Sequence, residues 1–207
     1  MKSILLGALC ISLLGAANAA TVTLDSVDQG TAFDANKDGI FDSINYSELT
    51  AGSDGANNTS RGLLEYALSS ISGNVTSAVL KLHTSGVQYQ GGLSLDVEFH
   101  GYIGDGVVAP SDALVDNLIS AIQIQDTSID LNVDVTSIVQ PLPAYAGFMI
   151  RLTDETVQEF QQFSSNSLVV NYSPVPIPPA LYLFGSGLIG LLGITGRFRS
   201  APRRRPM

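Results

Sequence analysis

The chain has 207 residues, a formal net charge of −9 and one cysteine, Cys10. The stretch 20–173 holds all 19 acidic residues but only four of the ten basic ones, so its formal net charge is −15. Such a surface attracts cations and repels anionic lipid and nucleic acid, which excludes nucleic acid as a partner. The stretch has the size of one domain and contains no thiol, so its fold must rest on a hydrophobic core or on metal.

The first 19 residues have the features of a secretory signal peptide. Lys2 supplies a short positive region, Ile4–Gly15 is apolar, and Ala17 and Ala19 form an Ala-x-Ala cleavage site. The apolar run is too short to span a membrane as a helix. We therefore expect signal peptidase to cut after Ala19 and the mature chain to be exported.

The body of the chain, residues 20–173, has the two-residue periodicity of β-strands. Apolar and polar residues alternate from Leu93 to Phe99, and again from Ile129 to Val135. Clusters of Gly, Asn, Asp and Ser separate the strands. Five further strands are expected at Thr21–Ser26, Gly62–Leu68, Thr76–Thr84, Gly147–Thr153 and Ser167–Tyr172.

Two short helices are expected within this body. One covers Ala113–Ile122, and the other begins at Thr136 as an N-cap and ends before Pro141. Between Ser26 and Arg61 the sequence lacks strong strand patterns. About eight strands with such turns favour an all-β fold, a jelly-roll-like antiparallel β-sandwich, over a helical or α/β fold.

The segment 34–42 has the spacing of a calcium-binding loop. Alternate oxygen-bearing side chains converge in such a loop while the glycine, here Gly39, takes a sharp turn. The expected calcium ligands are Asp34, Asn36, Asp38, the backbone carbonyl of Ile40, and Asp42. Asn45 stands where an EF-hand has its bidentate Glu, so the loop resembles those of dockerins and thrombospondin-type repeats. The alternative interpretation is a polar turn ahead of a strand.

Five pieces of the body resemble, in their order, the DNRLRE-type β-sandwich domains of bacterial surface proteins. They are Arg61–Ile71, Val75–Leu82, Asp134–Gln140, Gly147–Leu152 and Phe163–Tyr172. Those domains are similar to carbohydrate-binding modules, so the resemblance implies a jelly roll and contact with glycan. Because the chain has no Trp, aromatic stacking on a sugar would fall to Tyr89 or Tyr102.

Catalytic motifs are scarce in this sequence. The chain has two histidines, His83 and His100, and no Gly-x-Ser-x-Gly, His-Glu-x-x-His or phosphate-binding loop. Asp96, Glu98 and His100 share one face of a strand, a grouping that can bind metal. Polar neighbours on a solvated strand face are the simpler interpretation. We therefore predict no catalytic residues and a protein that is not an enzyme.

The last 34 residues combine a proline-rich motif, an apolar block and a basic tail. Residues 179–196 carry no charge, and as a helix they would be about 27 Å long, enough to cross the hydrocarbon core of a bilayer. The basic tail that follows contains Arg197, Arg199, Arg203, Arg204 and Arg205. Basic residues stay on the cytoplasmic side, so a plain C-terminal membrane anchor is one interpretation.

The amino-acid sequence of this segment resembles the PEP-CTERM sorting signal of Gram-negative bacteria. Val175, Pro176, Ile177 and Pro178 fill the motif, with Ile177 where the name-giving form has Glu, and Leu-Phe-Gly-Ser-Gly-Leu follows in the apolar block. The resemblance implies brief anchoring in the inner membrane and cleavage near the motif by an exosortase. It also implies delivery to the cell surface or to the exopolysaccharide matrix.

These patterns predict three segments: a signal peptide (1–19), a β-sandwich domain (20–173) and a sorting signal with a transmembrane helix (174–207). The main interpretation is a non-enzymatic surface or biofilm-matrix protein that binds glycan and calcium. One alternative is a secreted enzyme acting on matrix polysaccharide, since two of the 19 acidic residues could face each other across a cleft. The other is a structural component that binds nothing small.

Overall fold

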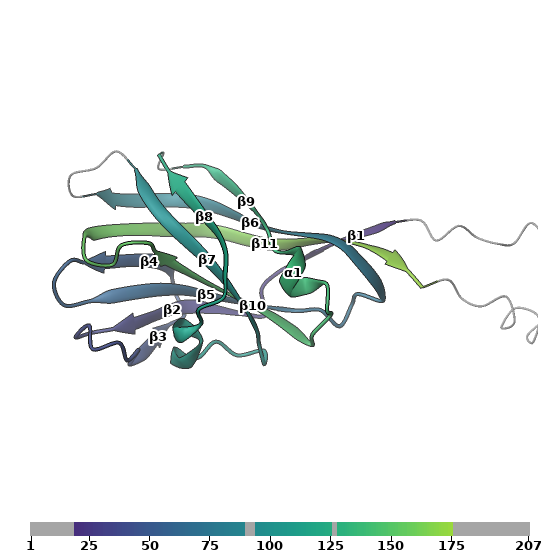
Figure 1. Cartoon of the computed structure of the whole chain (residues 1–207), viewed down its shortest axis with the longest axis horizontal. Coiled ribbons are helices and arrows are strands. Elements are labelled where there is room, and N and C mark those ends of the chain that lie inside the picture. Colours follow the sequence, from purple (N-terminus) through teal and green to yellow (C-terminus); the bar gives the residue numbers. More distant parts are fainter. Residues whose placement is uncertain (1–18, 90–93, 126–127, 176–207) are drawn as a thin grey trace, which may run out of the picture. The chain divides into compact units, whose positions relative to one another are not determined.

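The computed structural model describes residues 19–89, 94–125 and 128–175 of the chain (Figure 1). The stretch Ala19–Pro174 forms one compact unit. The predicted signal peptide, sorting motif, spanning helix and basic tail lie outside the described residues, apart from Ala19 and Val175. Within the described part, no helix is long and apolar enough to cross a membrane.

Strands dominate the described residues, and two short helical turns interrupt them. The strands are β1 (Ala20–Leu24), β2 (Asp28–Asp34), β3 (Ser43–Asn45), β4 (Leu49–Asp54), β5 (Thr59–Ala67), β6 (Gly73–Tyr89), β7 (Leu95–Ile103), β8 (Leu118–Ile124), β9 (Asp130–Asp134), β10 (Tyr145–Leu152) and β11 (Gln158–Pro174). The helical turns are the 3₁₀-helix η1 (Pro110–Leu114) and the α-helix α1 (Thr136–Val139).

The strands from β4 to β11 pair like one long hairpin folded over itself. β4 pairs with β11, β5 with β10, β6 with β9 and β7 with β8, all antiparallel. Two further antiparallel pairs, β6 with β11 and β7 with β10, draw the folded hairpin into two layers. This is the strand order of a jelly roll, so the predicted antiparallel β-sandwich is confirmed.

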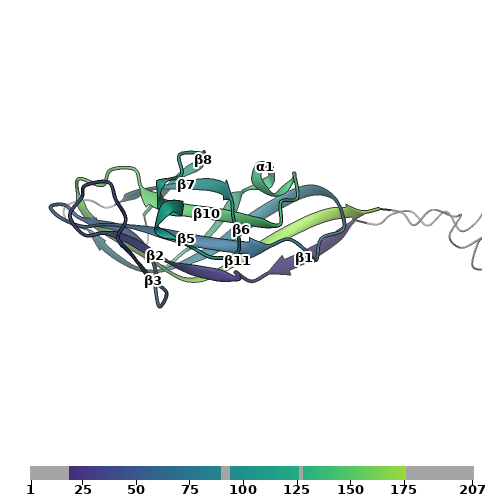
Figure 2. The ribbon, with the colours of Figure 1, turned by 90° about the horizontal axis from the view of Figure 1, so that it is seen from below.

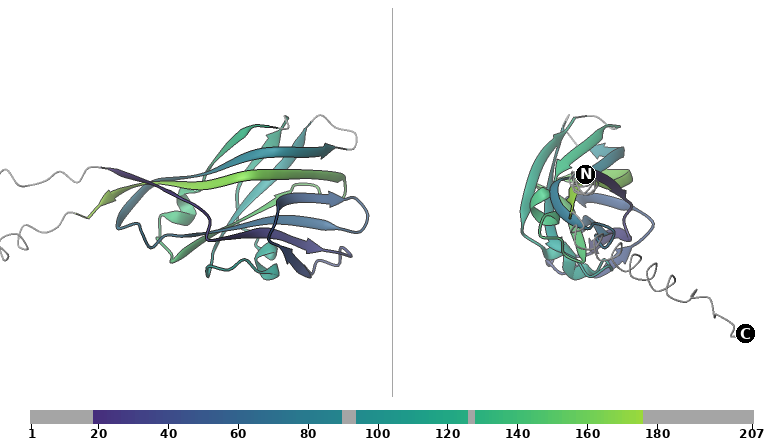
Figure 3. Two further views of the ribbon diagram at one scale, coloured as in Figure 1. Left: turned by 180° about the vertical axis from the view of Figure 1, so that it is seen from behind. Right: turned by 90° about the vertical axis from the view of Figure 1, so that its right-hand side faces the viewer.

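We name the two layers after their central strands. The β10 layer has the order β8-β7-β10-β5-β2-β3, and the β11 layer has the order β9-β6-β11, with β4 and β1 sharing the other side of β11. A short pairing of β4 with β5 joins the layers at Gly52 and Ser60. In Figure 2, β7, β8 and β10 lie on one side of the domain and β11 and β1 on the other. The end-on view in Figure 3 shows the strands wrapped around a common interior.

The main hydrophobic core lies between the layers, because alternate side chains of each strand point inward. Its largest members include Tyr66, Phe99 and Phe148, all fully buried. The Tyr66 hydroxyl donates a hydrogen bond to Oδ1 of Asn166 at 2.7 Å, which satisfies its polar end. A second, smaller cluster lies on the outward face of the β10 layer and consists of Ala32, Phe41, Leu63, Val108, Ala113 and Met149.

Each of the seven strands predicted from the sequence overlaps an observed strand. The interval 26–61 was expected to lack strands and instead holds β2, β3 and β4. Small residues interrupt the alternation of apolar and polar side chains there, because side chains of adjacent strands pack directly on the backbone. A side chain at Gly52, for example, would overlap the ring of Phe160.

The helix predicted at Ala113–Ile122 is wrong. Its first two residues belong to η1, and its last five, from Leu118, belong to strand β8, which pairs with β7. The isoleucines at 119, 122 and 124 are β-branched and suit an extended strand better than a helix. The second predicted helix exists as α1, although Val135 rather than Thr136 is its N-cap.

Candidate functional site

The outward face of the β11 layer is mainly polar, and we call it the open face. Cross-strand pairing arranges its side chains in four rows across β1, β11, β6 and β9. The rows are Thr21–Asn171–Ser77, Thr23–Val169–Val79–Asp134, Ser167–Lys81–Asn132 and Ser165–His83–Asp130. All of these residues are exposed or half-buried, since the alternate positions of the same strands fill the core.

Hydrogen bonds order the row at one end of the open face. Oγ1 of Thr21 donates to Oδ1 of Asn171 at 2.5 Å, and Nδ2 of Asn171 donates to Oγ of Ser77 at 2.9 Å. The three side chains therefore form a chain across three strands. Their remaining polar groups stay available to water or to a ligand.

The row at the other end centres on His83. Nδ1 of His83 lies 2.7 Å from Oδ1 of Asp130, and its Nε2 lies 3.2 Å from Oγ of Ser128. Ser, His and Asp in this order also occur in nucleophilic hydrolases, where a buried acid holds the base in place. Here the side chain of Asp130 is 82 % exposed, so water competes for the same contact. This exposure of the acid does not favour catalysis.

A cavity of about 360 Å³ lies at the His83 end of the open face. Its walls include Lys81 and Asn132 in one row and His83, Asp130 and Ser165 in the next. Lys81 has no ion pair and no side-chain hydrogen bond among the described residues, unlike Lys37, Arg61 and Arg151. The cavity thus offers hydrogen-bond donors and acceptors from three strands.

An apolar pair interrupts the polar rows. Val79 and Val169 are opposite each other in the register of β6 and β11, and both are half-buried. Polar rows lie on either side of the pair, with Ser77 and Asn171 on one side and Lys81 on the other. A ligand on this face therefore meets a short apolar stripe between two polar edges.

The outward face of the β10 layer is covered by residues 104–114, which we call the strap. Three hydrogen bonds fasten it to the sheet: Gly106 N to Oε2 of Glu65 (2.5 Å), Val108 N to Oδ2 of Asp28 (3.0 Å), and Nη1 of Arg61 to the Ala113 carbonyl (2.6 Å). Val108 and Ala113 of the strap pack on Leu63 and Met149, which are paired in the sheet. The strap therefore removes this face from solvent.

A buried carboxyl lies next to the strap. Glu65 is 1 % exposed, and burial raises its pKa, with Asp112 and Asp105 adding to the rise. Tyr102 reaches it across Gly147, where any side chain would overlap the Tyr102 ring. Burial also raises the pKa of Tyr102, with nearby acids including Glu65 contributing. Oε1 of Glu65 and the Tyr102 hydroxyl are neighbours, yet neither has a partner of normal hydrogen-bond geometry among the described residues.

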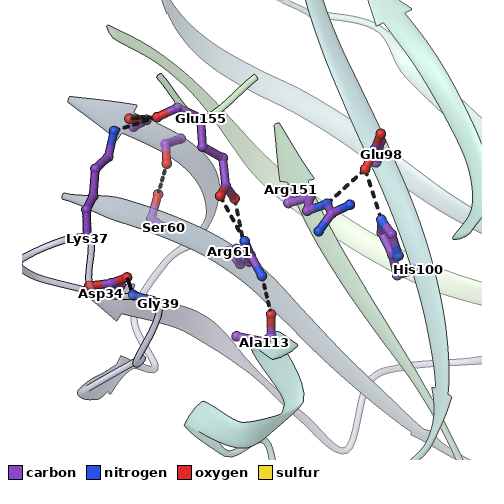
Figure 4. A network of polar contacts seen from close by, with 12 residues as sticks. Asp34, Lys37, Gly39, Ser60, Arg61, Glu98, His100, Ala113, Arg151 and Glu155 are labelled. Carbon is purple, nitrogen blue, oxygen red and sulfur yellow. Dashed lines mark hydrogen bonds and ion pairs between the residues drawn. The ribbon is translucent and has the colours of Figure 1, made fainter. Parts of the chain in front are cut away.

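Arg61 and Glu155 form the strongest ion pair near the strap (Figure 4). The pair is bidentate, with Nε to Oε1 at 2.7 Å and Nη2 to Oε2 at 2.8 Å. The guanidinium also lies over the Phe41 ring, 4.8 Å from its centre. A cavity of about 250 Å³ opens beside it, lined also by Asp34 and Lys37. Because Glu155 holds both Arg61 and, through its carbonyl, Lys37, these charges are engaged in the fold.

The predicted calcium loop follows β2 in the structure. Oδ1 of Asp34 accepts hydrogen bonds from the N–H groups of Asn36 and Asp38 (both 3.3 Å), and its Oδ2 accepts one from Gly39 (2.9 Å). Gly39 has a φ of +85°, the sharp turn expected of it. Asp42 reaches back to Ala35 N at 3.4 Å.

Ligand type and turn geometry in this loop fit calcium, but the carboxylates are occupied by loop N–H groups. The described residues contain no cluster of three or more acidic, His or Cys side chains that could hold a metal ion. Ile40 is 62 % exposed, and Asp38 bonds to Ile40 N and to the Asn36 side chain. Metal binding would therefore require the side chains of Asp38 and Asp42 to exchange these partners for the ion.

Of the grouping Asp96, Glu98 and His100, only Glu98 and His100 join an ion-pair network, which they form with Arg151, and the described residues contain no metal cluster there (Figure 4). Oε2 of Glu98 accepts from Nε of Arg151 at 2.8 Å and lies 3.1 Å from Nε2 of His100. Burial alone would raise the pKa of Glu98, but these partners outweigh it and lower the pKa. The sequence did not point to Arg151, because the contact joins two strands 53 residues apart.

Of the two tyrosines expected to stack on sugar, Tyr102 does not lie on the open face, and the side chain of Tyr89 lies outside the described part of the structure. Tyr102 is half-buried against Gly147, and Tyr89 ends β6 beyond the four rows. The open face itself was missed in the sequence. Its strands were each predicted, but the partners of His83 come from positions 47 and 45 residues away. Only the pairing of the strands brings them together.

No protein-family model and no curated protein sequence matches the chain. Among solved structures, it is similar to the CBM36-1 domain of a xylanase from the hindgut metagenome of Trinervitermes trinervoides, at 6 % identity and a TM-score of 0.36 over 75 % of this chain and 100 % of that one. It is also similar to a family 35 carbohydrate binding module from Clostridium thermocellum (9 %, 0.32, 72 % and 97 %) and to a Stig cyclase from Fischerella (13 %, 0.31, 74 % and 85 %). These scores are too low to carry an argument about ligand or fold, which rest on the geometry above.

Proposed function

We propose that the domain is a non-enzymatic glycan-binding module and that the open face is its binding site. The observation that carries the proposal is the arrangement of that face, with an apolar pair between polar rows and a cavity beside it. Sugar rings present C–H groups on their faces and hydroxyl groups around their rims. Val79 and Val169 suit the former, and the Ser, Asn and Lys side chains around them suit the latter.

We also propose that the module is part of an exported protein of the cell surface or extracellular matrix. The signal-peptide pattern of residues 1–19 and the PEP-CTERM-like pattern of residues 174–207 support this location. The partners would be signal peptidase, an exosortase and the inner membrane before processing, then matrix exopolysaccharide. The net charge of −15 in the body keeps nucleic acid out of this set.

Affinity electrophoresis of the whole chain tests glycan binding. The chain is run in a sugar-free non-ionic detergent through gels that contain a panel of polysaccharides. At least one polysaccharide should retard it, and Val79→Asp should remove the retardation because it places a charge on the apolar pair. Val107→Asp is the matched control, since Val107 is 58 % exposed on the strap, away from the open face. A chain that no polysaccharide retards would refute the proposal.

The same samples separate a binding module from an enzyme. Reducing-end and ester-release assays on each polysaccharide should detect no turnover. Turnover that disappears in Ser128→Ala or His83→Ala would instead assign the Ser128–His83–Asp130 group a catalytic role. Turnover that depends on a pair of acidic residues would favour a glycoside hydrolase.

Processing is tested on the protein recovered from cells that contain an exosortase. The intact mass of the mature form should show that it ends near Val175–Pro179 and lacks the basic tail. A stable membrane form that still carries Arg203, Arg204 and Arg205 would leave only the plain anchor.

We propose further that the loop 34–42 binds calcium. Its oxygen spacing and the turn at Gly39 support this. A ligand that binds only the folded state stabilises it by about 2.7 kcal/mol at a hundredfold excess over its dissociation constant. Millimolar calcium should therefore raise the melting temperature by several degrees, and magnesium should raise it less.

Two variants identify where the calcium effect arises. Asp38→Ala should abolish the rise in melting temperature. Asp54→Ala should keep it, because Asp54 accepts N–H groups of Ala56, Asn57 and Asn58 in a turn without the calcium spacing. An unchanged melting curve with calcium would reduce the loop to a polar turn.

A further inference from the structure

We infer that the open face selects uncharged glycans over glycans that carry carboxylates. This inference rests on the proposed glycan-binding function and names the ligand class of the same site. It follows from the local charges, from the mixed apolar and polar surface and from the absence of aromatic side chains among the described residues of the four rows.

The charges on the open face disfavour an anionic ligand. Lys81 is the only basic residue in the four rows, and Asp130 and Asp134 lie along the neighbouring strand, both exposed. At physiological ionic strength, charges more than about 8 Å apart are largely screened, so these local groups matter more than the net charge. Apart from His83, which pairs with Asp130, one positive and two negative side chains face the ligand. A polymer with a carboxylate on each repeat would meet net repulsion.

Asp134 keeps its charge over the relevant pH range. Thr136 donates to it from both Oγ1 (2.6 Å) and the backbone N–H (3.0 Å), and these hydrogen bonds lower its pKa. Asp130 is the partner of His83 in the last of the four rows. The two carboxylates thus lie at opposite ends of β9. Between them lies the row of Asn132 and Lys81, which lines the cavity.

Lys81 acts here as a hydrogen-bond donor rather than as a counterion. An ammonium group has three N–H donors. The hydroxyl oxygens of an uncharged sugar can accept as many of these hydrogen bonds as a carboxylate can. Asn132, Ser165 and Ser167 around it both donate and accept, which matches hydroxyl groups. Without an aromatic platform, each sugar unit contributes little, so polymers should bind better than short oligosaccharides.

The test compares acidic polysaccharides with their own carboxyl-reduced forms. The whole chain is run by affinity electrophoresis against alginate and polygalacturonate, against both after carboxyl reduction, and against neutral xylan, β-glucan and dextran. We expect retardation only by neutral or reduced polymers, with apparent affinity changing less than about twofold between 50 and 300 mM salt. Lys81→Gln removes the positive charge, so the variant should still be retarded more by reduced than by acidic polymers.

Two results would overturn the inference while leaving glycan binding intact. They are stronger retardation by an acidic polymer than by its reduced form, in the wild type or in Lys81→Gln, and loss of binding to the neutral polymers at 300 mM salt. Retardation by none of the polymers would instead refute the proposed function. Matching urea-unfolding curves of wild type and Lys81→Gln establish that the variant is folded.

Discussion

The two outward faces of this jelly roll differ in how far other parts of the chain cover them, although one fold produces both. On the β10 layer the strap buries Leu63, Met149 and Glu65, and bidentate or shared ion pairs engage the arginines. On the open face of the β11 layer most side chains are short and polar, and Lys81 has no ion pair or side-chain hydrogen bond among the described residues. A covered face stabilises the fold, whereas a polar face without cover adds little to folding and is available to a ligand.

This difference predicts that substitutions on the two faces will affect different measurements. Changes beneath or beside the strap should alter the free energy of unfolding. Comparable changes on the open face should leave stability nearly constant and act on binding. The three variant pairs below test the contrast by urea unfolding of residues 20–174, which contain the whole core.

The largest effect is expected from Arg61→Met. The substitution leaves the carboxylate of Glu155, which is 24 % exposed, without its bidentate partner and removes a clamp on the Ala113 carbonyl. We expect a loss of about 2–3 kcal/mol in the free energy of unfolding, less than for a fully buried pair. The matched change on the open face, Lys81→Met, should cost less than about 0.5 kcal/mol. Equal losses in both would contradict the contrast.

An intermediate effect is expected from Gly147→Ala. The new methyl group would overlap the ring of Tyr102, which is held beneath the strap, and overpacking of this kind costs about 2 kcal/mol. Gly86→Ala is the control in the β11 layer, where the nearest atom is the end of the flexible Gln162 side chain at 3.3 Å. The control should stay within about 0.5 kcal/mol of the wild type, because that side chain can move.

The smallest effect, and the one with opposite sign, is expected from Glu65→Gln. Burial raises the pKa of Glu65 above its ordinary 4.5, so the folded state binds its proton more tightly than the unfolded state. The wild type should therefore lose stability as pH rises from about 4.5 to the raised pKa. The loss is about 1.4 kcal/mol for each pH unit that separates the pKa of the folded state from that of the unfolded state.

Gln cannot ionise, so Glu65→Gln should be more stable than the wild type at pH 7 and no more stable at pH 4. Unfolding free energies at the two pH values measure this difference. Asn132→Gln on the open face provides the comparison and should differ from the wild type equally at both pH values, since neither side chain ionises. A Glu65→Gln variant that is less stable at pH 7 would show that the charged form has partners beneath the strap.

Alternating apolar residues made most strands predictable, including those of β6, β7, β9 and β10. The misses have local causes. β4 carries Gly52 where the ring of Phe160 packs on the backbone, so its apolar pattern is interrupted. The isoleucines of β8 also fit a helical spacing, and only the pairing of β8 with β7 shows that the segment is a strand. Pairing over long sequence distances has no local signal, and the open face depends wholly on such pairing.

The calcium loop illustrates the opposite case. Its turn at Gly39 and its oxygen spacing were visible in the sequence, and the structure has the turn. Which atoms bind Asp34 was not visible, because backbone N–H groups carry no sequence signature. The strap was likewise missed, since its clamps join side chains such as Asp28 to backbone groups 80 residues away.

β11 is the last strand of the domain to leave the ribosome, yet it lies at the centre of its layer. β4, β1 and β6 all pair with it, so that layer cannot assemble until residue 174 has been synthesised. The strands β1, β4 and β6 therefore lack their shared central partner until the end of synthesis. An unfolded thread is also the form that passes through a narrow secretion channel. Under the export proposed above, this order of assembly leaves the β11 layer unformed while the chain is still such a thread.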